Sequence, residues 1–225
     1  MKKTARVLVL AGMVALSLTG CASMVSSMVK NGPAINRLYV HDDPKVGDYA
    51  IYLLFSDPET STPSVATITL MKIMSVGDNY LIIDWQEKNS KFNLVHIEYL
   101  TDLDGNVMEA TYINDKGART KMAIATPTDK AYLAFDYDTL KKTTILTGKD
   151  KKEYECYEFH HSISSLGGTV TDVDYLDATR KVKFLKVHGR RTAVLSNDRV
   201  FFYITGLLEQ GNKDPNTNTL LIKEE

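Results

Sequence analysis

The sequence predicts a mainly β protein, in which an antiparallel meander forms a strongly curved sheet, a half-barrel or a barrel, with little helix. Two observations support this. Runs rich in Val, Ile, Thr, Tyr and Phe are bounded by Gly, Asn and Asp, and they recur at spacings of roughly 8 to 12 residues. No long segment between these runs shows the apolar stripe at helical spacing that a βαβ unit would need.

The expected strands fill most of the chain after residue 48. In order they are 49–55, 65–75, 80–87, 92–100, 107–113, 119–125, 131–137, 143–146, 154–161, 169–175, 182–188, 191–195, 200–204 and 219–223. A helical turn is compatible with the pattern at two places, 138–142 and 207–210.

The connections between these strands contain residues that tolerate positive φ, as hairpin turns require. Such residues occur at 76–79, 102–106, 114–117 and 188–190. Consecutive hairpins predict an antiparallel meander. Because no boundary interrupts the pattern, we expect residues 41–225 to form a single β domain.

The first 20 residues are expected to be a cleaved signal peptide. Lys2, Lys3 and Arg6 form a basic start, and an apolar run over 7–18 follows it. This order is typical of a secretory signal, and about a dozen apolar residues are too few for the roughly 20 that a membrane-spanning helix needs. We therefore expect the segment to be removed.

The end of this segment, Leu18-Thr19-Gly20-Cys21, resembles the lipobox of bacterial lipoproteins. The resemblance implies that the chain is cut between Gly20 and Cys21 and that the Cys21 sulfur carries lipid. A single acyl chain binds a membrane only marginally, whereas two or three chains hold it stably. We therefore expect a lipid anchor and flexible tether over 21–40, with the lipid on Cys21 as the membrane attachment.

The residues after Cys21 favour one membrane over the other. In bacteria with two membranes, an Asp directly after the lipidated cysteine commonly retains a lipoprotein in the inner membrane, but here Ala22 and Ser23 follow. The resemblance then implies the outer membrane, with the domain facing the periplasm. In a bacterium with one membrane, it implies the outer face of the cell membrane.

Composition argues against nucleic acid as a partner. Lys and Arg total 27 and Asp and Glu total 28, and three of the basic residues lie in the signal peptide. The remaining chain is mildly acidic and contains no block of Lys and Arg with interleaved aromatic residues. We therefore expect no nucleic-acid binding.

The two cysteines are Cys21 and Cys156. If lipid occupies Cys21, Cys156 has no partner for an intramolecular disulfide. We expect Cys156 to be a buried small hydrophobe, as free cysteines often are. An intermolecular bridge or a reactive thiol is the alternative.

Two groups of residues contain possible metal ligands. Cys156, Glu158 and His160 share a strand face at i, i+2 and i+4, and their side chains are of the types that bind zinc. The sequence identifies no fourth ligand, however, and packing aromatic residues surround them. The adjacent His160 and His161 would point to opposite faces. We expect no metal site here.

The acidic residues are expected to be structural. The Asp102–Asn106 segment is similar to the start of a calcium loop, but the EF-hand needs Gly at position six and Glu at position twelve, where this chain has Val107 and Ile113. A turn is therefore favoured. Asp172, Asp174 and Asp177 could supply oxygen ligands, but exposed acids on an edge strand are the favoured interpretation.

Twelve Tyr, seven Phe and the single Trp85 lie mostly within the expected strands. Packing in the sheet core is the ordinary explanation for them, and a concave apolar surface is the alternative. At the level of architecture, a meander on a lipid tether resembles the half-barrel LolA/LolB group of acyl-chain carriers. No motif matches that group, so the resemblance assigns no ligand-binding residue.

These observations predict a non-catalytic lipoprotein without a cofactor, because no motif for covalent, phosphate or dinucleotide chemistry occurs. We expect it to bind an apolar or acyl ligand or another envelope component. The alternatives are an envelope structural or protein-interaction lipoprotein without a small ligand, and a periplasmic hydrolase.

Overall fold

A computed structural model describes residues 34–56, 65–88, 93–124, 141–147, 152–165, 168–195 and 200–213. The signal peptide, Gly20, Cys21 and the strands predicted at 131–137 and 219–223 lie outside these residues. The described residues contain strands and turns and no helix.

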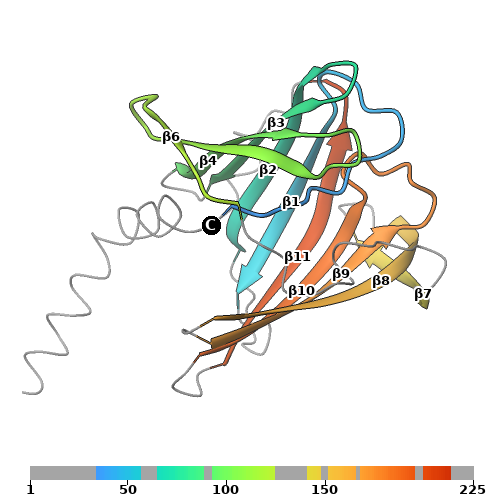
Figure 1. The fold of residues 1–225 in the computed structure, drawn as a ribbon. Helices are drawn as coiled ribbons and strands as arrows, with labels where there is room; N and C mark the ends of the chain where they lie inside the picture. The colour runs from blue at the N-terminus through green and yellow to red at the C-terminus, as the bar shows by residue number, and fades with distance from the viewer. Residues whose placement is uncertain are drawn as a thin grey trace, which may run out of the picture.

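The described residues form eleven strands in one antiparallel sheet, as predicted (Figure 1). They are β1 (Tyr49–Ser56), β2 (Val65–Val76), β3 (Leu81–Lys88), β4 (Asn93–Thr101), β5 (Val107–Ile113), β6 (Arg119–Lys121), β7 (Lys141–Thr147), β8 (Lys152–Ser165), β9 (Gly168–Asp177), β10 (Lys186–Leu195) and β11 (Val200–Gly211).

The sheet is a meander that stays open. Its strand order is β6-β5-β4-β3-β2-β1-β11-β10-β9-β8-β7, so every strand pairs with a chain neighbour except where β1 pairs with β11 in the middle. The strand β5 near one edge runs in a clearly different direction from the central strands β1 and β11 (Figure 1), and β7 lies against β10 and β11 as well as beside β8. The sheet is therefore strongly twisted and curls at the β7 edge.

One predicted pair of strands is wrong. The sequence suggested strands at 182–188 and 191–195 with a turn at 188–190, but β10 runs unbroken and the turn lies at 178–185. The Asp177 carboxylate accepts hydrogen bonds from the backbone N–H groups of Lys181 (2.7 Å) and Val182 (2.9 Å), which fixes that turn. The segment 207–210 lies within β11 and makes no helical turn.

Residues 34–41, which we call the strap, cross the sheet before β1 begins. Ala34 N donates to Ala123 O (2.7 Å), Leu38 N to Gly105 O (2.8 Å) and His41 N to Lys183 O (3.3 Å). The strap thereby connects the β5 and β6 edge to the turn between β9 and β10. The flexible tether expected over 21–40 therefore ends earlier, because Ala34, Leu38 and Val40 are buried in the core.

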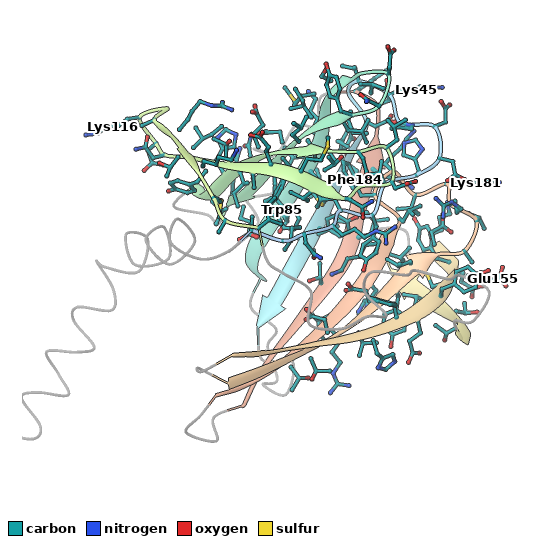
Figure 2. The ribbon with its side chains drawn as sticks, in the orientation of Figure 1. Lys45, Trp85, Lys116, Glu155, Lys181 and Phe184 are labelled. Atoms are coloured by element: carbon teal, nitrogen blue, oxygen red, sulfur yellow. The ribbon has the colours of Figure 1, made fainter. Side chains whose placement is uncertain are left out.

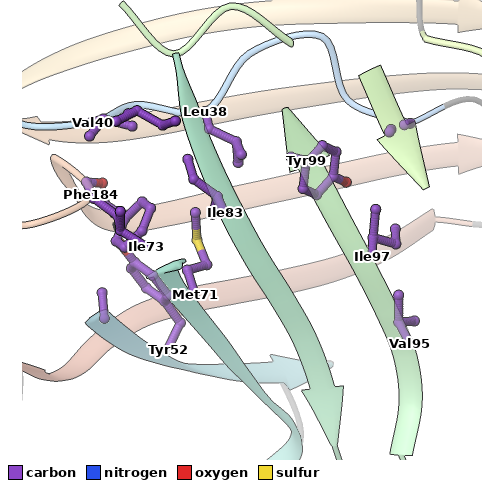
Figure 3. Packing of buried hydrophobic residues seen from close by; sticks show 14 of the residues in the cluster. Leu38, Val40, Tyr52, Met71, Ile73, Ile83, Val95, Ile97, Tyr99 and Phe184 are labelled. Carbon is purple, nitrogen blue, oxygen red and sulfur yellow. Dashed lines mark hydrogen bonds between the residues drawn. The ribbon is translucent and has the colours of Figure 1, made fainter. Parts of the chain in front are cut away.

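The main core lies between the strap and one face of the sheet, which we call the inner face (Figure 3). Leu38 and Val40 of the strap and Phe184 of the 178–185 turn pack over this face. Its buried side chains include Tyr52, Met71, Ile73, Ile83, Val95, Ile97 and Tyr99. Burying each large apolar side chain contributes about 1.5 to 3 kcal/mol, so the strap is an integral part of the domain.

Candidate functional site

An apolar row runs along the inner face of β3 and β4. Ile83 pairs with Tyr99, and Trp85 pairs with Ile97. Val95 lies two residues before Ile97 in β4 and therefore on the same face. The Trp85 and Tyr99 rings meet edge to face, with centroids 6.0 Å apart. Ile83, Tyr99, Ile97 and Val95 are buried, whereas Trp85 is partly exposed. Trp85 is therefore the aromatic residue of this row that can meet a ligand.

The row ends in polar groups. The Trp85 indole N–H donates to Glu87 Oε1 (3.1 Å), which satisfies its hydrogen-bonding capacity. Glu87 lies opposite Thr69 of β2, which is buried on the same face. An apolar surface that ends in a carboxylate and a hydroxyl suits an elongated molecule with one polar end.

Tyr52 attaches the 178–185 turn to the inner face. Its hydroxyl lies 3.0 Å from the Lys186 carbonyl oxygen and 3.3 Å from that of Phe184, and it donates to this pair. Burial, helped by the negative charge of Asp174, raises the pKa of Tyr52 far above its usual range. Tyr52 is therefore a structural donor and not an acid or base.

Asp172 and Asp174 lie where the sequence interpretation did not place them. The strand β9 lies between β8 and β10 and is not an edge, and each of these aspartates is buried, with 5 % of the residue exposed. Strand register connects Asp174 through Gly189 and Thr205 to the face that carries Tyr52. The expectation of exposed edge acids is therefore wrong, because both acids belong to the inner face.

A lysine compensates the charge of Asp174. Lys186 Nζ lies 2.6 Å from Asp174 Oδ1. Gly189 makes room for this ion pair, since a Cβ at Gly189 would come within 2.6 Å of Lys186 Cε and 3.0 Å of Asp174 Oδ1. The glycine predicted to form a turn thus allows a charged pair to lie across two strands.

The remaining candidate ligands do not converge. Asp177 caps the 178–185 turn, and Asp102 accepts hydrogen bonds from Asn106 N and Nδ2 (both 2.8 Å), as a turn residue does. His160 Nε2 lies 2.5 Å from Glu158 Oε1 near the surface. Among the described residues, no group of three or more His, Cys, Asp and Glu side chains could hold a metal ion.

Cys156 is fully buried, as predicted. Burial, together with the charges of Asp177 and Glu155, raises the pKa of its thiol to about 12. The thiolate is the reactive form of cysteine, and a raised pKa keeps the thiol protonated at neutral pH. Cys156 therefore packs as a small hydrophobe in the folded protein.

A buried polar cluster at the strap end was not predicted. Asp48 is 0 % exposed, and its carboxylate accepts hydrogen bonds from His41 Nε2 (2.8 Å), Asn212 Nδ2 (2.7 Å) and Lys45 N (2.9 Å) and lies 3.1 Å from Lys183 Nζ. Burial alone would raise its pKa, but these hydrogen bonds lower it overall. We call this cluster the Asp48 latch; it joins the strap, the 178–185 turn and the end of β11.

Comparisons with known proteins identify no relative. No protein-family model matches the chain, and no curated protein sequence matches it. In the part of the chain that the structure describes, no helix has the length and apolar character needed to cross a bilayer. The function is therefore inferred from the residues of the inner face and from the sequence.

Proposed function

We propose that the chain is a lipid-anchored, non-catalytic envelope protein whose inner face binds an elongated apolar ligand such as an acyl chain. The observation that carries the proposal is the apolar row of β3 and β4, which ends at the partly exposed Trp85 (Figure 2). Ten methylene groups buried against Trp85 and the open end of this row would contribute roughly 8 kcal/mol before the cost of association. Thr69 and Glu87 would meet the polar end of the ligand.

The anchor supports the same proposal. Twelve residues, Ala22 to Pro33, separate Cys21 from the strap. Fully extended, they span about 40 Å, so a lipid on Cys21 would keep the inner face close to a bilayer, which is a source of acyl chains. Outer-membrane attachment on the periplasmic side is the location that the lipobox resemblance favours.

Lipid attachment is tested by Cys21→Ser, which removes the thiol that lipid transfer needs. The variant is expected to lose radiolabelled palmitate and to leave the membrane fraction. Cys156→Ser is the matched control, since it removes the other cysteine and should keep the label. Equal palmitate incorporation by wild type and Cys21→Ser would contradict the proposal.

Ligand binding can be measured through Trp85, because it is the only tryptophan of the chain. A chain that begins at Ala22 would be titrated with a brominated fatty acid, whose bromines quench indole fluorescence on contact. We expect saturable quenching that Val95→Glu abolishes by placing a charge on the apolar row, with circular dichroism to establish that this buried substitution leaves the sheet folded. Gln86→Glu adds the same charge on the opposite face of β3 and should bind as wild type does. Quenching that never saturates would argue against an acyl ligand.

A further inference from the structure

Five large apolar side chains whose exposure the structure describes lie toward one end of the sheet. They are Val46 (59 % exposed), Met74 (49 %), Val76 (38 %), Leu103 (44 %) and Met108 (47 %), and we call this group the apolar end. Because the sheet is antiparallel, β1 and β5 begin at this end and β2 and β4 finish there. Single exposed apolar residues are ordinary, but five at one end require an explanation.

Strand register places the ends of the strands that carry Val76 and Met108 in one row. Val76 pairs with Leu81, Leu81 with Thr101, and Thr101 with Val107. Neighbouring strands lie about 4.8 Å apart, so this row from β2 to β5 is about 15 Å wide. Val46 joins it on the β1 side, since the next residue, Gly47, donates its N–H to Ile73 O (2.8 Å).

Acidic residues predominate in the two hairpin turns of the apolar end, although Arg37 bridges Asn106 beside one of them. Asp78, Asp102 and Asp104 lie in its two hairpin turns, and segments 73–83 and 99–108 contain no Lys or Arg. Asp102 is held by Asn106, whereas Asp78 and Asp104 form no ion pair with any described residue. Lys45, which Figure 2 labels near this end, is already paired with Asp43 at 2.9 Å. The surface is therefore apolar and acidic.

We propose that the apolar end is a docking surface for a basic amphipathic segment of another protein. Its methionine, valine and leucine side chains would contact the apolar face of the segment, and methionine adapts its shape to different partners. Asp78 and Asp104 would pair with Lys or Arg on the flanks of that segment. The row is about 15 Å wide, which equals the length of a helix of about ten residues at a rise of 1.5 Å per residue. Such a helix can present apolar side chains at i, i+3, i+4 and i+7 to the surface.

Charge selects this occupant over two others. An anionic lipid surface attracts basic segments and would repel Asp78 and Asp104. A second copy docked end to end would place the same acids opposite one another. The exposed residues lie at the end of the sheet whereas Trp85 lies within β3, so the proposal holds whether or not an acyl ligand binds.

The test measures peptide binding by the full chain in phosphatidylcholine nanodiscs, with protein-free discs as the background. The probe is a fluorescein-labelled 14-residue helix of Leu and Lys with Leu at i, i+3, i+4 and i+7. We expect saturable binding, at least tenfold tighter than that of a Leu and Glu peptide with the same Leu positions. Equal affinity for the two peptides would overturn the proposal.

Variants separate the two contributions. Asp78→Asn with Asp104→Asn should weaken binding at least tenfold and remove most of its salt dependence, and Met74→Gln with Met108→Gln should also weaken it at least tenfold. Asp115→Asn is the matched control, because it removes an exposed acid from the turn of Lys116 at the other end of β5. Wild-type affinity in both double variants, or docking of the apolar end on phosphatidylglycerol vesicles instead of the Leu and Lys peptide, would overturn the proposal.

Discussion

Two lysines that are three residues apart form ion pairs with very different roles. Lys183 lies 3.1 Å from Asp48, in a cluster that joins the strap, a turn and the end of β11. Lys186 lies 2.6 Å from Asp174, and this pair joins only the neighbouring strands β9 and β10. The first pair holds distant parts of the chain together, and the second places charge on the inner face.

The difference follows from the surroundings of each carboxylate. Asp48 is completely buried and accepts hydrogen bonds from groups on both sides of it in the chain, so its loss would leave the buried His41 and several partly buried donors without their acceptor. Lys186 is 30 % exposed, so water can replace part of its interaction with Asp174. We therefore expect stability to depend much more strongly on the Asp48 latch.

The largest effect is expected for Asp48→Ala, which should lower the free energy of unfolding by about 3 to 5 kcal/mol, because His41, Asn212 and Lys183 lose a buried acceptor. Urea denaturation followed by circular dichroism measures this. Asp43→Ala, at an acid in an exposed ion pair with Lys45, is the control and should change stability by less than about 0.5 kcal/mol. Similar losses of unfolding free energy in the two variants would show that the Asp48 latch stabilises the fold no more than a surface ion pair does.

The strap can be tested without altering a charge. Gly105 has φ of 83°, and a Cβ there would lie 1.7 Å from the Leu38 carbonyl oxygen. Gly105→Ala should therefore cost about 2 to 3 kcal/mol in thermal or urea unfolding, from both the left-handed backbone and the displaced strap. Gly117→Ala is the control, since φ is 78° there but nothing lies within 4 Å, and it should cost about 1 kcal/mol.

A smaller effect is expected on the other ion pair. Gly189→Ala would push the Lys186 side chain away from Asp174, because the new Cβ would lie 2.8 Å from Lys186 Nζ. We expect a loss of about 1 kcal/mol in urea unfolding. Lys186→Met removes the charge directly, and the double variant should cost little more than either change alone. Fully additive losses would show that Gly189 and Lys186 act independently.

The smallest effect on stability near neutral pH is expected from protonation of the Asp48 carboxylate. Since the folded pKa of Asp48 is lowered, its stabilisation is present above the unfolded value of about 3.9 and is lost as pH falls through the folded pKa. Urea midpoints should therefore change little through Asp48 between pH 7 and 5 and fall below pH 4. Asp48→Asn should show a weaker fall in acid, and an unchanged acid dependence would contradict this assignment.

The sequence was sufficient for local structure and less so for burial. Turn glycines such as Gly105 and Gly117, each with positive φ, correctly marked hairpins, and runs rich in β-branched and aromatic residues correctly marked β3 and β4. Gly189 misled because a glycine can serve either a turn or a close side-chain approach. Asp172 could not be assigned to an edge or an interior strand, since that depends on which strands pair.

The candidate site was predictable only in part. Trp85 was noted as an aromatic strand residue, but its position at the end of an apolar row depends on pairing with β4. The Asp48 latch could not be predicted from a local pattern. His41 is near Asp48 in sequence, but Lys183 and Asn212 are more than 130 residues away. The strap was missed because Leu38 and Val40 are too few to show a period.

The central position of the β1 and β11 pair has a consequence for how the chain matures. Tyr49 pairs with Gly211, whereas the other strand pairs are local in sequence. Pairing of such distant segments is slow to form, and β1 emerges from the ribosome long before β11 exists. Until synthesis is nearly complete, β1 lacks β11 and the strap lacks its contact with Lys183. The middle of the sheet therefore closes only after the C-terminal strands exist.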